Sequence, residues 1–553
     1  MRSASILLFV LSLLAAACGG AKDNTSDKEK GANKDFSVEQ ATTKKPEYGG
    51  DLTYAIEADP GGGTAGFCLP EAQLAISGMV VSRTFYDTLT IPNDDGGYSP
   101  WLAESVTPNA TYDSWDIKVR EGVTFHDGSK LDAEVVKMNF DAFRGKLPAR
   151  KPVLFLLIFQ NIADVVVKDP MTVTVTTKTP WPAFPAYLWS NARFAISAKA
   201  QLESTDCASK IIGTGPFKYK EYVQGDHVSG LRNENYWAKA DNGDQLPYLD
   251  SITLKVVIEG MQRVSGLESG ALNVIHVSGG SEIRRVREMA EAGRKQLLES
   301  DKFGEVSYAL LNVKKPPFDN INARLAVAHG LDRQDIINKS EDGVQNRADG
   351  PFSKGSVGYL EDPGFPEYDI AKAKEYLAKY KEETGKDLEV TVGHTPDAGV
   401  TKTANLVREQ AEAFGVKVNL QPIEQGSLIN TALGGNFEAL LWRNHPGGDP
   451  DTQYVWWHSG MITNFSGIND AQIDADLDQG RVETDPEKRK ALYEDLNRQF
   501  AKNAYNVWNW FTLWAIGFDT KVHNILGPKL PDGSAPSSGL ANAHSMAGLW
   551  MEK

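Results

Sequence analysis

The stretch Ile211–Trp237, IIGTGPFKYKEYVQGDHVSGLRNENYW, decides the fold of this chain. Gly213 and Gly215 precede a proline, so the backbone can turn sharply here but cannot continue a helix. Apolar and charged residues nearly alternate from Phe217 to Val223, which suits a half-buried strand. A Gln-Gly-Asp turn signal follows, and His227–Arg232 can return as the partner strand. The stretch is therefore predicted to be a glycine-bracketed β-hairpin.

Length and charge narrow the class of protein. The chain has 553 residues, too many for one hydrophobic core, so two or three domains are expected. Hydrophobic residues make up 41% and charged residues 24%, as in an ordinary globular protein. The formal net charge of −15 argues against nucleic-acid binding, which requires a basic face, and disfavours attraction to anionic lipid.

The N-terminus has the pattern of an export signal. Arg2 precedes an apolar run, Ile6–Leu14, that is too short to span a bilayer as a helix. Three alanines then lead to Cys18 and resemble a lipoprotein processing box, with Cys18 as the lipidated first residue of the mature protein. Residues 1–18 are thus interpreted as a lipoprotein signal peptide. The alternatives are a plain signal peptide or an uncleaved anchor, and both also export the protein.

The segment after the signal is predicted to be a disordered tether. Residues 19–45 are polar and almost free of large apolar groups, so they cannot bury enough surface to offset the entropy of ordering. Such a tether would let a folded body, anchored by lipid, reach a partner in the membrane. The protein is expected at the outer face of the cell membrane or in the periplasm.

Two cysteines remain in the mature chain, Cys68 and Cys207. A lone pair outside the cytoplasm usually oxidises, so a disulfide is expected rather than two free thiols. No CxxC motif or His/Cys cluster with zinc spacing is present, and neither a metal nor a cofactor is expected.

Further blocks surround the hairpin. Ala72–Leu89 is predicted to be a helix, and Trp115–Arg120 alternates as a strand. In the block EGVTFHDGSKLDAEVVKMNFDAF, Asp132 can cap a helix whose apolar residues share one face. His126 has no nucleophile or metal ligand at a suitable spacing, so it is interpreted as a histidine that fixes a turn.

Helices and strands alternate from Tyr368 onward. Asp369 can cap a helix that Gly385 ends. The strands 388–392 and 416–420 flank a second helix at 403–414, and this βαβ order implies a parallel sheet. Near the end of the chain, Asp485 and a following proline open one more helix.

The hairpin with its trailing RNENYW, the LAES block and the GVTFHDG block resemble the signatures of family 5 solute-binding proteins, the peptide- and nickel-type receptors of ABC importers. The resemblance implies an α/β fold of two lobes, the type II periplasmic-binding-protein (Venus flytrap) fold, with an additional inserted domain. Its implied spans are a discontinuous domain I at 46–89, 197–306 and 516–553, an inserted domain II at 90–196, and domain III at 307–515 as the second lobe.

Aromatic residues concentrate in the C-terminal third, where a ligand site is predicted. Tryptophan offers a large apolar area and one polar group, which suits an enclosed site for a mixed ligand, although ordinary core packing is the alternative. A strand ends at Trp442 and opens into an irregular loop, as at ligand sites of open α/β sheets. The predicted ligand-binding residues are Trp442, Arg443, Asn444, His445, Trp456, Trp508 and Trp510.

One departure from the family pattern bears on the ligand. Oligopeptide and dipeptide receptors show W-x-x-D-Y here, with the aspartate pairing to the peptide ammonium group. This chain has His445 in place of that aspartate, after Trp442, Arg443 and Asn444. Arg443 or His445 could instead face an anionic or hydroxyl-rich ligand, and a nickel chelate stays open as well.

The resemblance implies a monomeric, lipid-anchored receptor that captures a peptide or similar small polar solute and delivers it to a membrane permease, without enzymatic activity. The alternative is an exported hydrolase acting on a peptide- or sugar-like substrate. HExxH, GxSxG and P-loop motifs are absent, but carboxylate pairs leave little trace in a sequence. A third alternative is a receptor-like fold reused for chaperoning or signalling.

Overall fold

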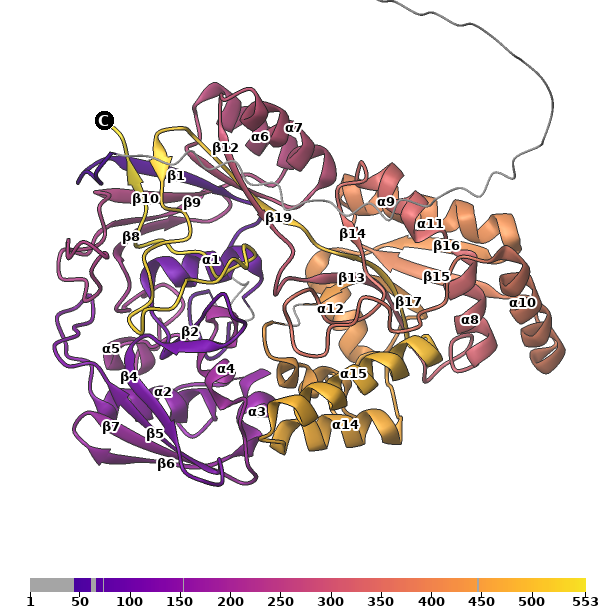
Figure 1. Ribbon diagram of the computed structural model, residues 1–553, viewed down its shortest axis with the longest axis horizontal. Helices are drawn as coiled ribbons and strands as arrows, with labels where there is room; N and C mark the ends of the chain where they lie inside the picture. Colours follow the sequence, from indigo (N-terminus) through magenta and orange to yellow (C-terminus); the bar gives the residue numbers. More distant parts are fainter. Residues whose placement is uncertain (1–43, 61–65, 73, 153, 445–446) are drawn as a thin grey trace, which may run out of the picture. The chain divides into compact units, whose positions relative to one another are not determined.

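The computed structural model describes residues 44–553 apart from 61–65, 73, 153 and 445–446 (Figure 1). The predicted signal peptide and nearly all of the predicted tether lie outside the described residues. Three sheets of four or more strands organise the described part of the chain. Two short antiparallel pairs accompany them: β2 (Thr90–Pro92) with β3 (Tyr98–Pro100), and β20 (Val522–His523) with β21 (Trp550–Met551).

The first sheet has seven strands in the order β12-β19-β11-β1-β10-β9-β8. Their bounds are β1 Asp51–Ile56, β8 Phe217–Val223, β9 His227–Arg232, β10 Ser251–Val256, β11 Val274–Val277, β12 Gln296–Ser300 and β19 Trp514–Phe518. Strands β8 and β9 pair in antiparallel fashion with Val223 opposite His227, which confirms the predicted hairpin. Helices α6 (Gly260–Ser269) and α7 (Gly280–Glu291) lie side by side along this sheet (Figure 1).

A buried carboxylate explains several residues of the hairpin signature. Asp87 is 3% exposed and accepts hydrogen bonds from four side chains. These are Trp101 Nε1 at 2.8 Å, Thr214 Oγ1 at 2.9 Å, Tyr236 OH at 3.0 Å and Trp237 Nε1 at 3.1 Å. A buried charge is tolerated when it is fully hydrogen-bonded, so Asp87 ties the beginning and the end of the signature to one point.

The two signature glycines permit a close backbone approach to helix α1 (Ile76–Phe85). A Cβ atom on Gly213 would lie 2.1 Å from the Phe85 carbonyl oxygen, and one on Gly215 would lie 2.4 Å from its carbonyl carbon. Gly215 N–H donates to Phe85 O at 3.1 Å. The helix therefore ends at Phe85, and the longer helix predicted at Ala72–Leu89 was wrong at both ends.

The second sheet has four strands in the order β4-β5-β7-β6 (Ala103–Pro108, Ser114–Val119, Thr172–Thr177 and Ile162–Asp169). It is packed with α2 (Ala133–Phe143), which the Asp132 side chain caps as predicted by accepting from Val135 N. The short helices α3 (Leu154–Ile158), α4 (Phe184–Trp189) and α5 (Lys199–Leu202) follow. His126 Nε2 lies 3.0 Å from Gly215 O, in agreement with a role in fixing a turn.

The third sheet has six strands in the order β14-β18-β13-β17-β15-β16. Their bounds are β13 Val306–Leu311, β14 Asn346–Arg347, β15 Glu389–His394, β16 Lys417–Pro422, β17 Ala439–Asn444 and β18 Asn506–Phe511. Strands β15 and β16 are parallel and joined through α11 (Ala398–Phe414), which confirms the βαβ unit. Helix α11 begins at Ala398, earlier than predicted, because Asp397 caps it by accepting from Val400 N at 2.9 Å.

Helices on the third sheet end where the sequence indicates. Asp369 caps α10 (Ile370–Thr384), which stops at Gly385, and Asp485 caps α15 (Pro486–Asn503) as predicted. The remaining helices are α8 Ile321–Gly330, α9 Arg333–Ser340, α11 Ala398–Phe414, α12 Gln425–Gly434, α13 Tyr454–Trp457 and α14 Ala471–Val482, with the 3-10 turn η4 at Pro450–Gln453.

Two hydrophobic cores divide the described chain into lobes. One core joins the seven- and four-stranded sheets, and the other lies within residues 306–511 around the six-stranded sheet; no residue belongs to both. We call these parts the first and the second lobe. A smaller cluster under α6 and α7 covers the other face of the seven-stranded sheet.

The chain crosses between the two lobes at two adjacent segments. Residues 301–305 connect β12 to β13, and residues 512–513 connect β18 to β19. Thr512 N–H donates to Glu305 O at 2.9 Å, which ties the segments together. Gln345 of the second lobe donates to Ser278 O of the first and accepts from Leu513 N, both at 2.7 Å.

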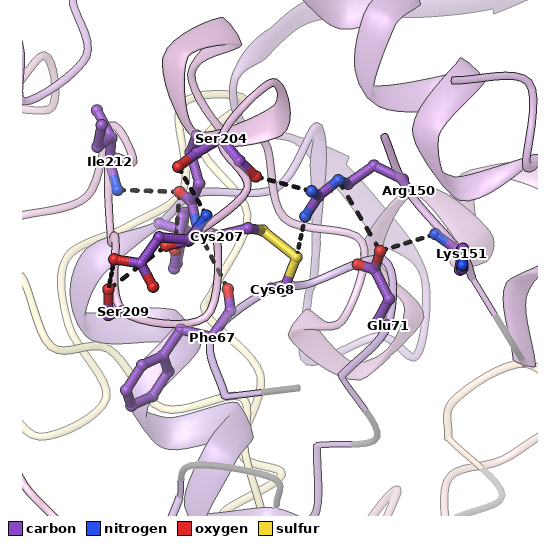
Figure 2. The surroundings of a disulfide bond; sticks show 12 residues. Phe67, Cys68, Glu71, Arg150, Lys151, Ser204, Cys207, Ser209 and Ile212 are labelled. Atoms are coloured by element: carbon purple, nitrogen blue, oxygen red, sulfur yellow. Dashed lines mark hydrogen bonds and ion pairs between the residues drawn. A yellow bond between two sulfur atoms is a disulfide. The ribbon is translucent and has the colours of Figure 1, made fainter. Parts of the chain in front are cut away.

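A disulfide links Cys68 to Cys207 across 139 residues (Figure 2). It connects the segment after β1 with the segment that leads into the hairpin signature. Arg150 lies beside it, with hydrogen bonds to Cys68 Sγ and, at 2.8 Å, to Ser204 O. The bond predicted from the two remaining cysteines is thus present in the structure.

Candidate functional site

Strand pairing separates the predicted ligand-binding residues onto two faces of the six-stranded sheet. Two residues of the central strand β13 lie opposite them: Ser307 faces Arg443 and Trp510, and Tyr308 faces Trp442 and Trp508. Directly opposed residues share a face, and successive residues of a strand point to opposite faces. Arg443 and Trp510 therefore share one face, and Trp442 and Trp508 share the other.

A β-bulge in β18 places Trp508 and Trp510 on opposite faces of the sheet. The register between β13 and β18 shifts between Ser307 and Tyr308, so that Asn509 is the extra residue between Trp508 and Trp510. Without the bulge, residues two apart on a strand would lie on the same face. The spacing of the two tryptophans alone predicts one common face, and the structure shows otherwise.

The face that carries Trp442 is largely an aromatic packing surface. The Trp442 and Trp456 rings lie 5.7 and 5.8 Å from the Phe465 ring, and both residues are partly buried against the second core. Trp508 is 0% exposed and lies 5.0 Å from Tyr308. A role for these three tryptophans in binding stays a prediction.

Arg443 lies among carboxylates from both lobes. Its Nη1 is 3.5 Å from Glu305 Oε2, and its side chain is 46% exposed while that of Glu305 is 3% exposed. Glu305 raises the pKa of the Arg443 guanidinium, whereas burial lowers it. Glu57, Asp397 and Glu341 raise this pKa further. Glu57 directly follows β1 of the first lobe, and burial raises the pKa of its carboxyl while Arg443 lowers it.

We name this arrangement the Arg443 group. Its members act on one another electrostatically and come from both lobes: Glu57, Arg263 and Glu282 from the first, Glu305 from the crossover, and Glu341, Asp397 and Arg443 from the second. The group contains two guanidinium groups and five carboxyl groups, and burial raises the pKa of two of these carboxyls, Glu57 and Glu341. Such a site can pair with an amine through its carboxylates and with an acidic group through Arg443.

The remaining predicted residues lie next to Arg443 in sequence. Asn444 Nδ2 donates to Gln453 Oε1 at 2.9 Å, which ties the end of β17 to the 3-10 turn η4. His445 lies outside the described residues. Among the described residues, Cys68, Glu71 and Cys207 have ligand atoms spaced as in a metal site, but the two sulfur atoms are joined in the disulfide.

Sequence reasoning missed the carboxylates of the Arg443 group. Glu57 directly follows β1, and Glu305 lies in a connection without any periodic pattern. The sequence contains a signal for Glu57, because residues at the carboxyl end of a sheet strand are frequent ligand contacts. It contains none for Glu305, which reaches Arg443 only through the crossover between the lobes.

A pH dependence follows from Glu341, which joins the lobes near the crossover. Its Oε2 accepts from Gly280 N of α7 at 3.0 Å, and burial raises the pKa of the carboxyl to about 7, above its ordinary 4.5. The folded protein then holds this proton more tightly than the unfolded chain. Stability should fall as the pH rises from 4.5 to 7, by about 3 kcal/mol at most.

The Glu341→Gln variant should be more stable than the wild type above pH 7 and should lack this slope. Urea denaturation at several pH values measures the effect. Glu382→Gln, at an exposed position of α10, is the control and should leave the slope unchanged. Equal slopes for the wild type and Glu341→Gln would contradict the expectation.

The fold and the site together define a type II periplasmic binding protein, an α/β protein of two lobes. A solved structure with this fold, the binding protein AgaA from A. tumefaciens R10 in complex with agropinic acid, matches with a TM-score of 0.76 at 23% identity, covering 91% of this chain and 99% of that one. Residues 97–464 match the bacterial extracellular solute-binding proteins, family 5 (middle). The chain therefore belongs to this family of binding proteins.

Two relatives span most of the chain. The oligopeptide-binding protein AppA of Bacillus subtilis (strain 168) is 25% identical over 524 residues, 90% of each chain. The glutathione-binding protein GsiB of Salmonella paratyphi A is 26% identical over 429 residues, 75% of this chain and 81% of its own. Among the described residues, no helix has the length and apolar character needed to cross a membrane.

Proposed function

We propose that this protein is the receptor of an ABC importer, which captures a peptide or similar small polar solute between its lobes and delivers it to a membrane permease. The observation that carries the proposal is the Arg443 group, which combines charged residues of both lobes beside the two crossover segments. A solute that contacts both lobes binds the closed state more tightly than the open state. This difference in affinity stabilises the closed state.

The charges of the Arg443 group favour a solute with both an amine and an acidic group. The carboxylates of the group suit an ammonium group of the solute. They can take the role of the aspartate that is absent at position 445. The half-exposed Arg443 guanidinium suits a carboxylate. The relatives AppA and GsiB are named for oligopeptide and glutathione binding, and peptides have both kinds of group.

Native mass spectrometry of protein purified without unfolding tests the proposal. We expect a retained small solute with an amine and an acidic group, which shifts the tryptophan fluorescence when it is added back to the emptied protein. Chemical conversion of that solute by the purified protein would support the exported hydrolase instead. Binding without conversion separates the two functions.

The lipid anchor is the second part of the proposal and rests on the processing box at Cys18. Cys18→Ala should shift the protein from the membrane fraction to the soluble exported fraction, with the fold unchanged, because the thiol that receives the lipid is gone. Fractionation and immunoblotting measure the shift. Ser26→Ala, in the predicted tether, is the matched control, and membrane retention of Cys18→Ala would contradict lipid attachment.

A further inference from the structure

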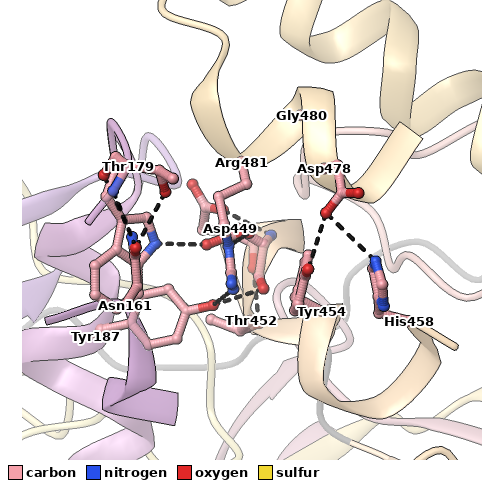
Figure 3. Close-up of polar contacts among 12 residues, drawn as sticks. Asn161, Thr179, Tyr187, Asp449, Thr452, Tyr454, His458, Asp478, Gly480 and Arg481 are labelled. Atoms are coloured by element: carbon pink, nitrogen blue, oxygen red, sulfur yellow. Dashed lines mark hydrogen bonds and ion pairs between the residues drawn. The ribbon is translucent and has the colours of Figure 1, made fainter. Parts of the chain in front are cut away.

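Asp451 connects the two lobes at a place far along the chain from the crossover segments. Its carboxylate accepts a hydrogen bond from Trp181 Nε1 at 2.7 Å, and its backbone oxygen accepts one from Tyr187 OH at 2.6 Å. Trp181 and Asp451 are both 0% exposed. Figure 3 shows Tyr187 reaching from the first lobe toward Arg481 of the second. We call Trp181, Tyr187, Asp451 and Arg481 the Asp451 contact.

The charges of the Asp451 contact all come from the second lobe. Arg481 Nε donates to Asp451 Oδ1 at 2.9 Å, and its guanidinium lies 3.6 Å from the centre of the Tyr454 ring. The neighbouring Asp449 pairs with Arg489 through two hydrogen bonds of 2.6 and 2.9 Å. The first lobe contributes only the neutral donors Trp181 and Tyr187. The ion pairs can therefore persist when the lobes part. What is lost is the hydrogen bonds of these two donors and the 3.2 Å hydrogen bond that Arg481 Nη2 donates to Tyr187 OH.

The apolar packing of the contact also stops at the boundary between the lobes. Trp181 and Tyr187 belong to the first core, with their ring centres 4.4 Å apart, and Trp181 lies 5.3 Å from Phe184. Neither belongs to the second core. Interfaces that open and close are more polar than permanent ones, because separation then exposes no hydrophobic core. The Asp451 contact has this character.

The Asp451 contact is linked to the Arg443 group through one short segment. Asn444, the residue after Arg443, donates to Gln453, which is 0% exposed and lies two residues beyond Asp451 in η4. Asp449 caps this turn by accepting from Asp451 N at 2.9 Å. A solute that fixes the end of β17 therefore also fixes the turn that holds Asp451.

We propose that the Asp451 contact is a latch that stabilises the closed arrangement of the two lobes, with Asp451 as its acceptor and Trp181 and Tyr187 as its donors. The inference rests on the proposed function, since closure matters only if a solute is held between the lobes. Hydrogen bonds to a charged group shift an equilibrium by about ten- to a hundredfold. The latch would set how long the receptor stays closed.

Distance measurement between the lobes tests the latch without any solute. Spin labels at Glu134→Cys in α2 and Lys502→Cys in α15, both exposed, report the distance in otherwise full-length Cys18→Ala protein with its disulfide intact. Trp181→Phe combined with Tyr187→Phe removes both donors and leaves an aromatic ring at each position. We expect the ratio of closed to open protein to fall by at least about tenfold.

Trp115→Phe is the matched control. It removes an indole N–H that donates at 3.3 Å to Tyr112 O within the first lobe, from a residue that is 3% exposed. This variant should keep the wild-type distance distribution. Asp451→Asn is a second test that retains the shape of the acceptor, and it should also lower the ratio of closed to open protein.

Two results would overturn the latch: a wild-type distance distribution in both the double variant and Asp451→Asn, or an equal change in Trp115→Phe. Circular dichroism and an intact disulfide identify folded variants, and Trp181→Phe alone replaces the double variant if that one fails to fold. The distance measurement uses no solute, so a negative result does not contradict the receptor proposal. Conversely, a latch measured in this way is not contradicted if mass spectrometry finds no bound solute.

Discussion

Replacing Arg443 by methionine should weaken binding of the retained solute by at least roughly tenfold, because a hydrogen bond to a charged group contributes about 1.5–3 kcal/mol and Arg443 is partly exposed to solvent. The substitution removes the guanidinium that meets an acidic group of the solute and takes away one positive charge beside Glu305 and Glu57. Isothermal titration calorimetry of the emptied protein with the solute identified by mass spectrometry measures the loss.

Two comparisons give this experiment its controls. Arg408→Met on α11 removes an arginine whose hydrogen bond goes to Asn405 on the protein surface, and it should bind as the wild type does. Trp442→Ala tests the opposite face of the sheet. Wild-type affinity in Arg443→Met together with loss of binding in Trp442→Ala would move the site from the Arg443 group to the aromatic face.

Removal of the disulfide should lower the free energy of unfolding by about 4–5 kcal/mol, if its main effect is to restrict a long loop in the unfolded chain. The two cysteines are separated by 139 residues, and the bridged segments both precede the hairpin signature. Urea denaturation of Cys68→Ala/Cys207→Ala, followed by tryptophan fluorescence, measures the change.

Reduction provides the internal control for this measurement. A reducing agent should shift the wild-type midpoint to that of the double variant and should leave the double variant unchanged. Coincident transitions for the oxidised protein and the double variant would show that the cross-link adds no stability. A shift of the double variant in reducing agent would show that the agent acts elsewhere.

Local patterns predicted the elements of the fold well where short-range physical chemistry decides them. The hairpin at β8–β9, the parallel β15–α11–β16 unit and the caps at Asp132, Asp369 and Asp485 all depend on residues within a few positions of one another. Helix α1 differed because its end is set by Gly215, which approaches Phe85 from far along the chain. No local pattern contains that contact.

The candidate site was predictable only in part. Arg443 and Asn444 follow from a strand that opens into a loop, but Glu57 and Glu305 join them only after the two lobes are assembled. The tryptophans were expected to act together, yet the bulge at Asn509 places Trp508 and Trp510 on opposite faces. A bulge depends on how two strands pair, and neither strand encodes it alone.

The sequence by itself determined the family and most elements of each sheet, because signatures, composition and periodicity act over short stretches of chain, and the export signal stays a prediction. Only the tertiary structure decided which charges meet Arg443, which donors satisfy Asp87 and which residues join the lobes at Asp451. Thr214 and Asp87 lie 127 residues apart along the chain and Trp181 and Asp451 lie 270 apart, so their geometry exists only once the chain has folded.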